Sequence, residues 1–151
     1  MKLCLPTLLT IAALMCGNAV ADLTANCDTQ ARYALLQTPV VFDSASAQLP
    51  SDAYGILQRL AEIAFECPTA RIEVGGHTDS RGIEHTNTTL SRQRAEAVAT
   101  ALIAIGIDPN RLSAKGYGGT QPVADNDTRR GRARNRRITV VFSVVDRLQA
   151  D

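Results

Sequence analysis

The 151-residue sequence predicts an α/β (α+β) sandwich, one domain in which helices cover a mixed β-sheet and a short helix precedes the rest. Two segments, 50–67 and 88–105, carry apolar residues at helical spacing. Short apolar or alternating stretches, which are typical of strands, lie before, between and after these segments. An apolar content of 45% and a charged content of 21% match a globular domain that can bury a core.

Residues 1–21 have the layout of a secretory signal peptide. Lys2 is followed by an apolar run at 3–15, and the small-x-small sequence Ala19-Val20-Ala21 stands directly before Asp22. The apolar run is shorter than the roughly 20 residues that a membrane-spanning helix needs, and no later segment is apolar enough to span a membrane. We therefore expect an exported protein whose mature chain begins at Asp22 and lies in the periplasm.

The four cysteines divide between the leader and the mature chain. Removal of the leader takes away Cys4 and Cys16 and leaves Cys27 and Cys67. An even number of cysteines in an exported chain predicts a disulfide, here closing a loop of about 40 residues, although two buried free thiols are the alternative. Lipidation at Cys16 is an alternative start of the mature chain, at the outer membrane, but Met15 is bulkier than the residue that normally precedes such a cysteine.

The elements follow from the positions of apolar stripes and turn residues. Asp43 ends the first strand, Asn87 is the N-cap candidate of the long helix, and Gly106 stops that helix. In chain order, the pattern predicts a helix at 23–37, strand at 38–43, helix from 50 to about 67, strand at 70–74, loop at 75–82, helix at 88–105, strand at 111–118, loop at 118–134 and strand at 136–145. Residues 22–38 therefore form an N-terminal helical extension.

An arginine is expected on the buried face of the long helix. Arg94 lies four residues after Leu90 and four before Val98, within the apolar stripe. A guanidinium does not lose its charge, so a buried one needs a carboxylate or an anionic ligand, unless it reaches out to water. Asp79, on the loop leading into this helix, is the natural acid. We expect Arg94 and Asp79 to face each other across a binding site.

A second arginine is expected at the same place. Arg136 has the parity of the apolar residues of the last strand, such as Ile138, and would project from the mouth of the apolar face. Two cations on apolar faces, beside loops that hold Asp43 and Asp79, predict a pocket that binds both signs of charge.

Several separate blocks, in order along the chain, carry a family resemblance. They are FDSASAQL (42–49), GGHTDSRG (75–82), Asn87 with LSRQRAEAVATALIAIGI (90–107), RLSAKGYG (111–118), PVADNDT (122–128) and GRARNRRI (131–138). Together they resemble the OmpA-like peptidoglycan-binding domain family. That family includes the C-terminal part of OmpA, the peptidoglycan-associated lipoprotein and the periplasmic part of MotB. The resemblance implies a β/α/β/α/β domain at 39–146, followed by a tail at 147–151.

The resemblance also implies a ligand, the meso-diaminopimelate of the peptidoglycan stem peptide, and the residues that bind it. By position in the motifs these are Phe42, Asp43, Thr78, Asp79, Asn87, Leu90, Arg94 and Arg136. Asp79 would bind the ammonium and Arg94 the carboxylate at the distal end of diaminopimelate. The glycines around residues 77–79 would let backbone N–H groups approach the ligand. The resemblance implies that the protein anchors itself, or an outer-membrane or envelope complex, to the cell wall. The alternative is that it serves as a wall-binding accessory subunit of a secretion or other envelope machine.

Two other classes of protein are disfavoured by the residues. His77 and His85 are eight positions apart, with neither an HExxH motif nor a third metal ligand, and GxSxG is absent. We therefore expect no enzyme, no cofactor and no metal site. The segment 129–137 holds six arginines, but the net charge is only +1 and an exported protein rarely meets nucleic acid, so no nucleic-acid partner is expected. These arginines could face anionic wall polymers, an acidic partner or water.

Overall fold

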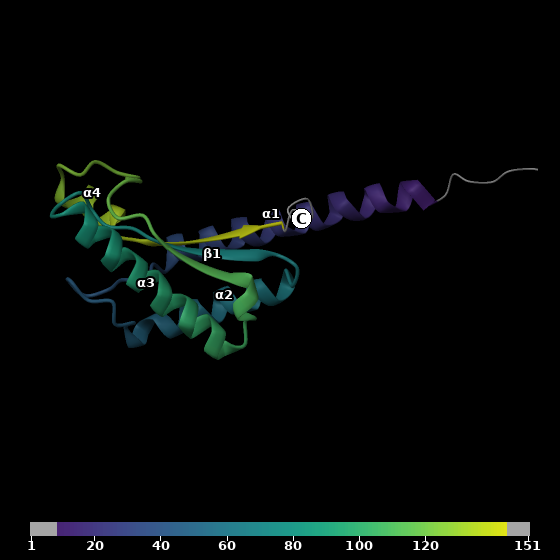
Figure 1. Cartoon of the computed structure of the whole chain (residues 1–151), viewed down its shortest axis with the longest axis horizontal. Helices are drawn as coiled ribbons and strands as arrows, with labels where there is room; N and C mark the ends of the chain where they lie inside the picture. Colours follow the sequence, from purple (N-terminus) through teal and green to yellow (C-terminus); the bar gives the residue numbers. More distant parts are fainter. Residues whose placement is uncertain (1–8, 145–151) are drawn as a thin grey trace, which may run out of the picture.

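The structure, a computed structural model, describes residues 9–144, with side chains from 19 onward. Its elements are α1 (Leu9–Gln37), η1 (Ser51–Ala53), α2 (Tyr54–Glu66), β1 (Arg71–Gly76), α3 (Glu84–Ile105), η2 (Pro109–Arg111), β2 (Leu112–Gly116), α4 (Arg129–Asn135) and β3 (Ile138–Ser143). Helices pack on one mixed sheet, which confirms the predicted α+β class (Figure 1). Lys2, Cys4 and the expected tail at 147–151 lie outside the described residues.

The sheet has the strand order β2-β1-β3. β1 is parallel to β2 and antiparallel to β3, so that Val74 lies between Ala114 and Val140. A parallel neighbour needs a crossover connection, which α3 supplies between β1 and β2. Because β1 is the central strand, the segment that leaves its carboxyl end at Gly76 emerges in the middle of one end of the sheet.

Both predicted apolar stripes contribute to the core, beside residues from α1 and the strands. On α2 the side chains of Ile56, Leu57, Leu60, Ile63 and Ala64 are all buried. On α3 the buried face includes Val98 and Leu102, and the helix ends at Gly106, whose φ of 116° is a left-handed conformation that disfavours other residues. Among the described residues, no helix combines the length and hydropathy needed to cross a membrane.

The first predicted strand, 38–43, is wrong: the structure has a bend at Thr38 and then irregular chain without a ladder partner. The free edge of β3 lies beside α1 instead, and Asp28 on α1 accepts a hydrogen bond from the backbone N–H of Phe142 at 3.0 Å. A helix therefore covers the edge of the sheet that a strand would otherwise pair with. Val40 is still buried in the core, which keeps the segment against the domain.

Other boundaries also differ from those expected. α1 begins before residue 23 and runs without a break through the predicted cleavage site, extending well beyond the rest of the domain in Figure 1. The predicted loop at 118–134 contains most of α4, whose N-cap Thr128 accepts a hydrogen bond from Gly131 N at 2.9 Å. β3 begins at Ile138, so Arg136 lies at the end of α4 and not within a strand.

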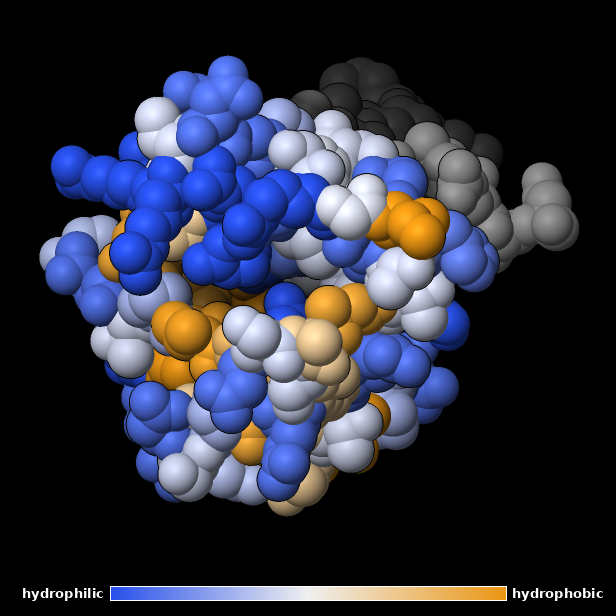
Figure 2. Space-filling view, turned by 90° about the vertical axis from the view of Figure 1, so that its left-hand side faces the viewer, coloured by the Kyte–Doolittle hydropathy of each residue, from blue (hydrophilic) through white to orange (hydrophobic). Residues whose placement is uncertain are grey.

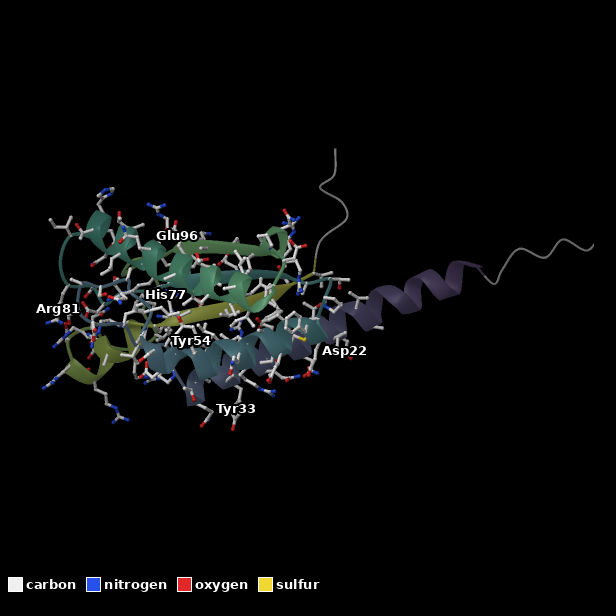
Figure 3. The ribbon with its side chains drawn as sticks, turned by 90° about the horizontal axis from the view of Figure 1, so that it is seen from below. Asp22, Tyr33, Tyr54, His77, Arg81 and Glu96 are labelled. Carbon is white, nitrogen blue, oxygen red and sulfur yellow. A yellow bond between two sulfur atoms is a disulfide. The ribbon has the colours of Figure 1, made fainter. Side chains whose placement is uncertain are left out.

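The predicted disulfide between Cys27 and Cys67 is present and joins α1 to the end of α2. In Figure 3 it lies at the Asp22 end of the domain, away from Arg81. Arg111 stabilises the connection between α2 and β1 next to this disulfide. Its guanidinium donates hydrogen bonds to three main-chain carbonyls at the end of α2 and just before β1. Carbonyls at the end of a helix lack partners within that helix, so a cation stabilises them.

Candidate functional site

The predicted site residues lie at the end of the domain where β1 stops and α4 packs. Four segments meet there: the exit from β1, the first half of α3, residues 42–46, and the loop with α4 that precedes β3. Figure 2 faces this end and shows a hollow with hydrophobic side chains in it, bordered by strongly hydrophilic ones. Apolar walls beside charged groups are the usual make-up of a small-molecule site.

The glycines at the exit from β1 serve close packing and not flexibility. Both Gly75 and Gly76 belong to the strand and are buried, which corrects the predicted loop. A Cβ on Gly76 would lie 1.9 Å from the main-chain oxygen of Ser91, so only glycine lets β1 approach α3 this closely. The close approach places the chain after β1 directly beside the first half of α3.

The backbone N–H groups after β1 are used inside the domain. His77 N donates to Arg137 O at 3.0 Å, and Thr78 N donates to Gly118 O at 2.9 Å. These two N–H groups are therefore engaged within the domain. They fix the chain on both sides just before Asp79, so that its carboxylate has a defined position.

Asp79, which we expected to face Arg94 across a binding site, is paired directly with Arg136. Arg136 Nη1 donates to Asp79 Oδ2 at 2.8 Å, while Arg81 donates to Oδ1 through its backbone N–H at 3.0 Å and lies 3.5 Å away through Nε. Asp79 is only 6% exposed, and burial by itself would raise the pKa of its carboxyl. The hydrogen bonds from Arg136 and Arg81 outweigh burial and hold that pKa below its ordinary value, so Asp79 is a carboxylate at neutral pH.

Arg94 is buried, as its place in the apolar stripe predicted, and only 6% exposed. Its Nε donates to Ser46 O at 2.8 Å and its Nη2 to Asp43 O at 2.9 Å, and its guanidinium lies 5.3 Å from the centre of the Phe42 ring. Burial and the nearby charge of Arg136 lower the pKa of its guanidinium below the ordinary value. Arg94 therefore organises the segment 42–46 and faces the same space as Arg136.

Asp43 contacts Arg94 through its main chain and not through its carboxylate. The side chain of Asp43 is exposed, whereas its carbonyl oxygen accepts from Arg94. Asn87 is not the N-cap of α3, because the helix begins at Glu84 after Ile83. Asn87 Nδ2 instead donates to Arg81 O at 2.9 Å and so holds the turn that carries Asp79.

Two further predicted residues belong to the segments that meet at this end of the domain. Leu90 is half-buried one turn before Arg94 on α3. Thr78 is 7% exposed, and its hydroxyl oxygen has no hydrogen-bond partner among the described residues. A buried hydroxyl without a partner is unfavourable in an apolar setting, so it is a candidate for a contact that a ligand completes.

His77 lies inside the domain, as Figure 3 shows. Its ring stacks on Tyr117 at 5.0 Å between centroids, and Nε2 lies 3.1 Å from Thr139 Oγ1. Burial, helped by the charge of Arg137, lowers the pKa of His77 from 6.5 to about 4. The histidine is therefore neutral at physiological pH and packs as part of the domain.

Half of the arginines in 129–137 are held by the domain itself. Their acceptors are Asn126 O and Asp127 O for Arg132, Asp79 for Arg136, and Gln121 O for Arg137. Arg129, Arg130 and Arg134 are exposed. Part of the basic segment thus builds the site and the loop beside it.

The sequence interpretation missed Arg81 and two asparagines, Asn126 and Asn135. Arg81 follows Asp79 by two residues, the spacing at which an aspartate accepts from a backbone N–H in an Asx turn, and that spacing was a usable signal. Asn135 is fully buried beside Arg136, and Asn126 bonds to it across nine residues. Nothing local in the sequence distinguishes these two asparagines from ordinary loop residues.

The fold and the site together define a class: a small α+β domain that holds one buried carboxylate and two arginines at the end of its central strand. The chain belongs to the OmpA family, whose model matches residues 41–136. This confirms the family resemblance that the motifs indicate.

Three known proteins illustrate the similarity. The peptidoglycan-associated lipoprotein from Burkholderia pseudomallei is 32% identical and superposes with a TM-score of 0.66, over 73% of this chain and 93% of that one. The cell wall anchor of the T6SS from Pseudomonas aeruginosa is 38% identical with a TM-score of 0.61, over 68% of this chain and 75% of that one. The peptidoglycan-binding protein ArfA of Mycobacterium tuberculosis is 41% identical over 105 residues, 70% of this chain and 32% of ArfA. This chain spans about a third to a half of the length of the curated relatives it matches.

Proposed function

We propose that this protein binds peptidoglycan without catalysis and anchors itself, or an envelope complex, to the cell wall. The observation that carries the proposal is the buried Asp79 carboxylate paired with Arg136, together with the buried Arg94 whose charge interacts with that of Arg136, at the hollowed end of the domain. The similarity to a peptidoglycan-associated lipoprotein, to a wall anchor and to ArfA supports it.

The proposed ligand group is the distal end of meso-diaminopimelate, which carries an ammonium and a carboxylate on one carbon. The ammonium would replace Arg136 on Asp79, and the released Arg136 would turn to the ligand carboxylate together with Arg94. This exchange keeps every buried charge paired, which matters because an unpaired buried charge is strongly unfavourable. Arg94 Nη1 makes no hydrogen bond within the described part of the chain and so keeps a donor for the carboxylate.

The remaining predicted residues would complete this pocket. Leu90 and Phe42 would border the methylene groups of the ligand, and the Thr78 hydroxyl would gain the partner that it lacks. Asn87 and the Asp43 carbonyl would act indirectly, by holding the Arg81 turn and the Arg94 side chain. The complete proposed set is Phe42, Asp43, Thr78, Asp79, Asn87, Leu90, Arg94 and Arg136.

Location and processing belong to the same proposal. Export by residues 1–21 would place the domain in the periplasm, with cleavage after Ala21 or, alternatively, lipidation at Cys16 at the outer membrane. The similarity to the T6SS wall anchor supports a role as the wall-binding subunit of a larger envelope machine. Mass spectrometry of the protein from the cell envelope would identify its N terminus and any lipid.

The test is calorimetry with matched stem peptides that differ only at residue three. Lysine offers the ammonium but no carboxylate, so its peptide leaves the arginines without their anion. We expect a loss of at least roughly 2–3 kcal/mol, or about 30- to 150-fold in affinity. Amidation of the diaminopimelate carboxylate should weaken binding less, since an amide oxygen still accepts hydrogen bonds. Equal affinity for the lysine and diaminopimelate peptides would contradict this account of the ligand.

Two companion measurements check the broader function. Purified sacculi should retain the protein, and excess free diaminopimelate should release it. The protein should leave muropeptides intact on prolonged incubation. Cleavage of muropeptides would favour the alternative of a peptidoglycan-modifying enzyme.

A further inference from the structure

Asn135 is the residue directly before Arg136, and its side chain has no exposed surface. Its Oδ1 accepts hydrogen bonds from Val123 N at 2.8 Å and Ala124 N at 2.9 Å. Its Nδ2 donates to Ala124 O at 2.8 Å and to Asn126 Oδ1 at 2.9 Å. A side-chain amide has two donors and two acceptor lone pairs, so every hydrogen-bonding position of Asn135 is used. A buried polar group with all its partners present has one orientation, which fixes the backbone just before Arg136.

Asn126 connects this group to the other half of the ion pair. Its Oδ1, already bonded to Asn135, also accepts from Ser80 N at 3.2 Å, and Ser80 directly follows Asp79. One oxygen atom therefore joins the residue after Asp79 to the residue before Arg136. Arg132 Nη1 holds the main chain of the same loop through Asn126 O and Asp127 O, both at 2.8 Å.

The ion pair by itself gives little reason for Arg136 to stay in place. The Arg136 side chain is 44% exposed, and a partly exposed pair gains little from attraction while it loses side-chain entropy. Its geometry thus depends on how well the backbone is held at both ends. The hydrogen bonds of Asn126 and Asn135 provide that hold across the two segments.

We propose that Asn126 and Asn135 are positioning residues that align Arg136 with Asp79 through their shared hydrogen bond. The functional part of this inference rests on the proposed function: with the backbone fixed, Arg136 stays within reach of the ligand carboxylate once an ammonium displaces it from Asp79. Preorganisation of this kind raises affinity because less freedom is lost on binding.

The experiment compares three variants of the full mature chain. Asn126→Ala removes the oxygen that Ser80 and Asn135 share, and Asn126→Asp keeps an oxygen at that place. Asn110→Ala is the matched control, because Asn110 also bonds within a short turn, to Asp108, but lies before β2 at the opposite end of the sheet. The readouts are retention on sacculi, hydrogen exchange at the Ser80 amide, and the pKa of the Asp79 carboxyl by NMR.

A merely structural role for Asn126 would lower stability without changing the Asp79 carboxyl in the folded protein. Our inference predicts that Asn126→Ala raises the pKa of Asp79, since Arg136 is one of the groups that hold it down, and exposes the Ser80 amide to exchange. Retention on sacculi should fall roughly tenfold, about the value of one hydrogen bond. Asn126→Asp should restore most of the retention, and Asn110→Ala should resemble the wild type in all three readouts.

Unchanged Asp79 pKa and unchanged retention in folded Asn126→Ala would overturn the inference, as would rapid exchange of the Ser80 amide in the wild type. If the alanine variant does not fold, Asn126→Ser takes its place, because the shorter side chain does not reach both partners. The pKa and exchange readouts need no ligand. Failure of the wild type to bind sacculi would therefore contradict the proposed function. The Asp79 pKa and the Ser80 amide exchange would still show whether Asn126 positions Arg136.

Discussion

Arg136 Nη1 lies 2.8 Å from Asp79 Oδ2 and joins two residues that are 57 positions apart in the chain. Arg94, the partner that the sequence suggested for Asp79, instead donates to the main chain of Asp43 and Ser46. The two arginines therefore have different structural roles. Arg136 balances the charge of the buried Asp79 carboxylate. Arg94 instead holds the segment 42–46 in place and adds a second positive charge at this end of the domain.

Replacement of Asp79 by alanine should abolish retention on sacculi and leave the fold intact. Binding is lost because the proposed ligand ammonium then has no counter-charge. The fold persists because the partly exposed Arg136 can reach water, so the substitution leaves no unpaired charge buried in the domain. Sacculus pulldown and circular dichroism would measure the two effects. Wild-type retention by folded Asp79→Ala would show that this carboxylate does not bind the wall.

Arg94→Ala should lose retention as well, but with a cost in stability that Asp79→Ala lacks. Two main-chain carbonyls, of Asp43 and Ser46, lose their charged donor, which we expect to lower the free energy of unfolding by about 2–3 kcal/mol. Urea unfolding would measure the cost. Arg92→Ala is the matched control, because Arg92 lies on the same helix but is exposed and pairs with Glu96. An Arg94→Ala protein that binds sacculi as Arg92→Ala does would contradict the assignment.

Reduction of the Cys27–Cys67 disulfide, or the double substitution to serine, should lower stability by roughly 3–4 kcal/mol, the value for a loop of this length in the chain-entropy model. The bond lies at the end of the domain opposite to Arg81, so ligand recognition should persist (Figure 3). Denaturant unfolding with and without reductant, followed by calorimetry on the reduced protein, tests both parts. Loss of ligand affinity in a reduced but folded sample would indicate coupling between the two ends.

The stability of the domain should decrease as the pH falls from about 6.5 to about 4. Within this window an unfolded chain protonates His77, whose ordinary pKa is 6.5, but the folded protein does not until about 4. The unfolded state therefore binds more protons and is favoured, by up to roughly 3 kcal/mol at 1.36 kcal/mol per pH unit. Below about pH 4 this contribution stays constant.

Urea unfolding at pH 7 and pH 4.5 would test this, with His77→Gln and the exposed His85→Gln compared with the wild type. The loss between the two pH values should shrink in His77→Gln and stay unchanged in His85→Gln. An equal loss in all three proteins would mean that His77 does not control this part of the pH dependence.

Some features of the site followed from local sequence. Arg94 was placed on the buried face of its helix because a 3.6-residue repeat orients a side chain without knowledge of the rest of the fold. The segment 38–43 shows the limit of such reasoning. Its apolar residues suit a strand, but whether a strand forms depends on a partner edge, and α1 lies along that edge through Asp28.

The same limit applies to α4. Its seven residues are too few for a stable isolated helix, and the polar sequence carries no apolar stripe. The helix is held by contacts from its side chains to the preceding loop, from Arg132 to two carbonyls and from Asn135 to the residues near Ala124. Such contacts exist only once the loop has folded back over the end of the sheet.

The sequence alone determined the α+β class, the two core helices, the cysteine pairing and the residue types of the site, because periodicity, cysteine count and motif spacing are properties of the chain itself. Only the tertiary structure decided which arginine meets Asp79. A guanidinium on a long flexible side chain finds its acceptor through the packing of distant segments, so Arg136 reaches the carboxylate after α4 has positioned it, while Arg94 turns to Asp43 and Ser46. The tertiary structure also explains why residue 76 is a glycine: a Cβ there would collide with the main chain of Ser91, and the two residues are close only when β1 packs on α3.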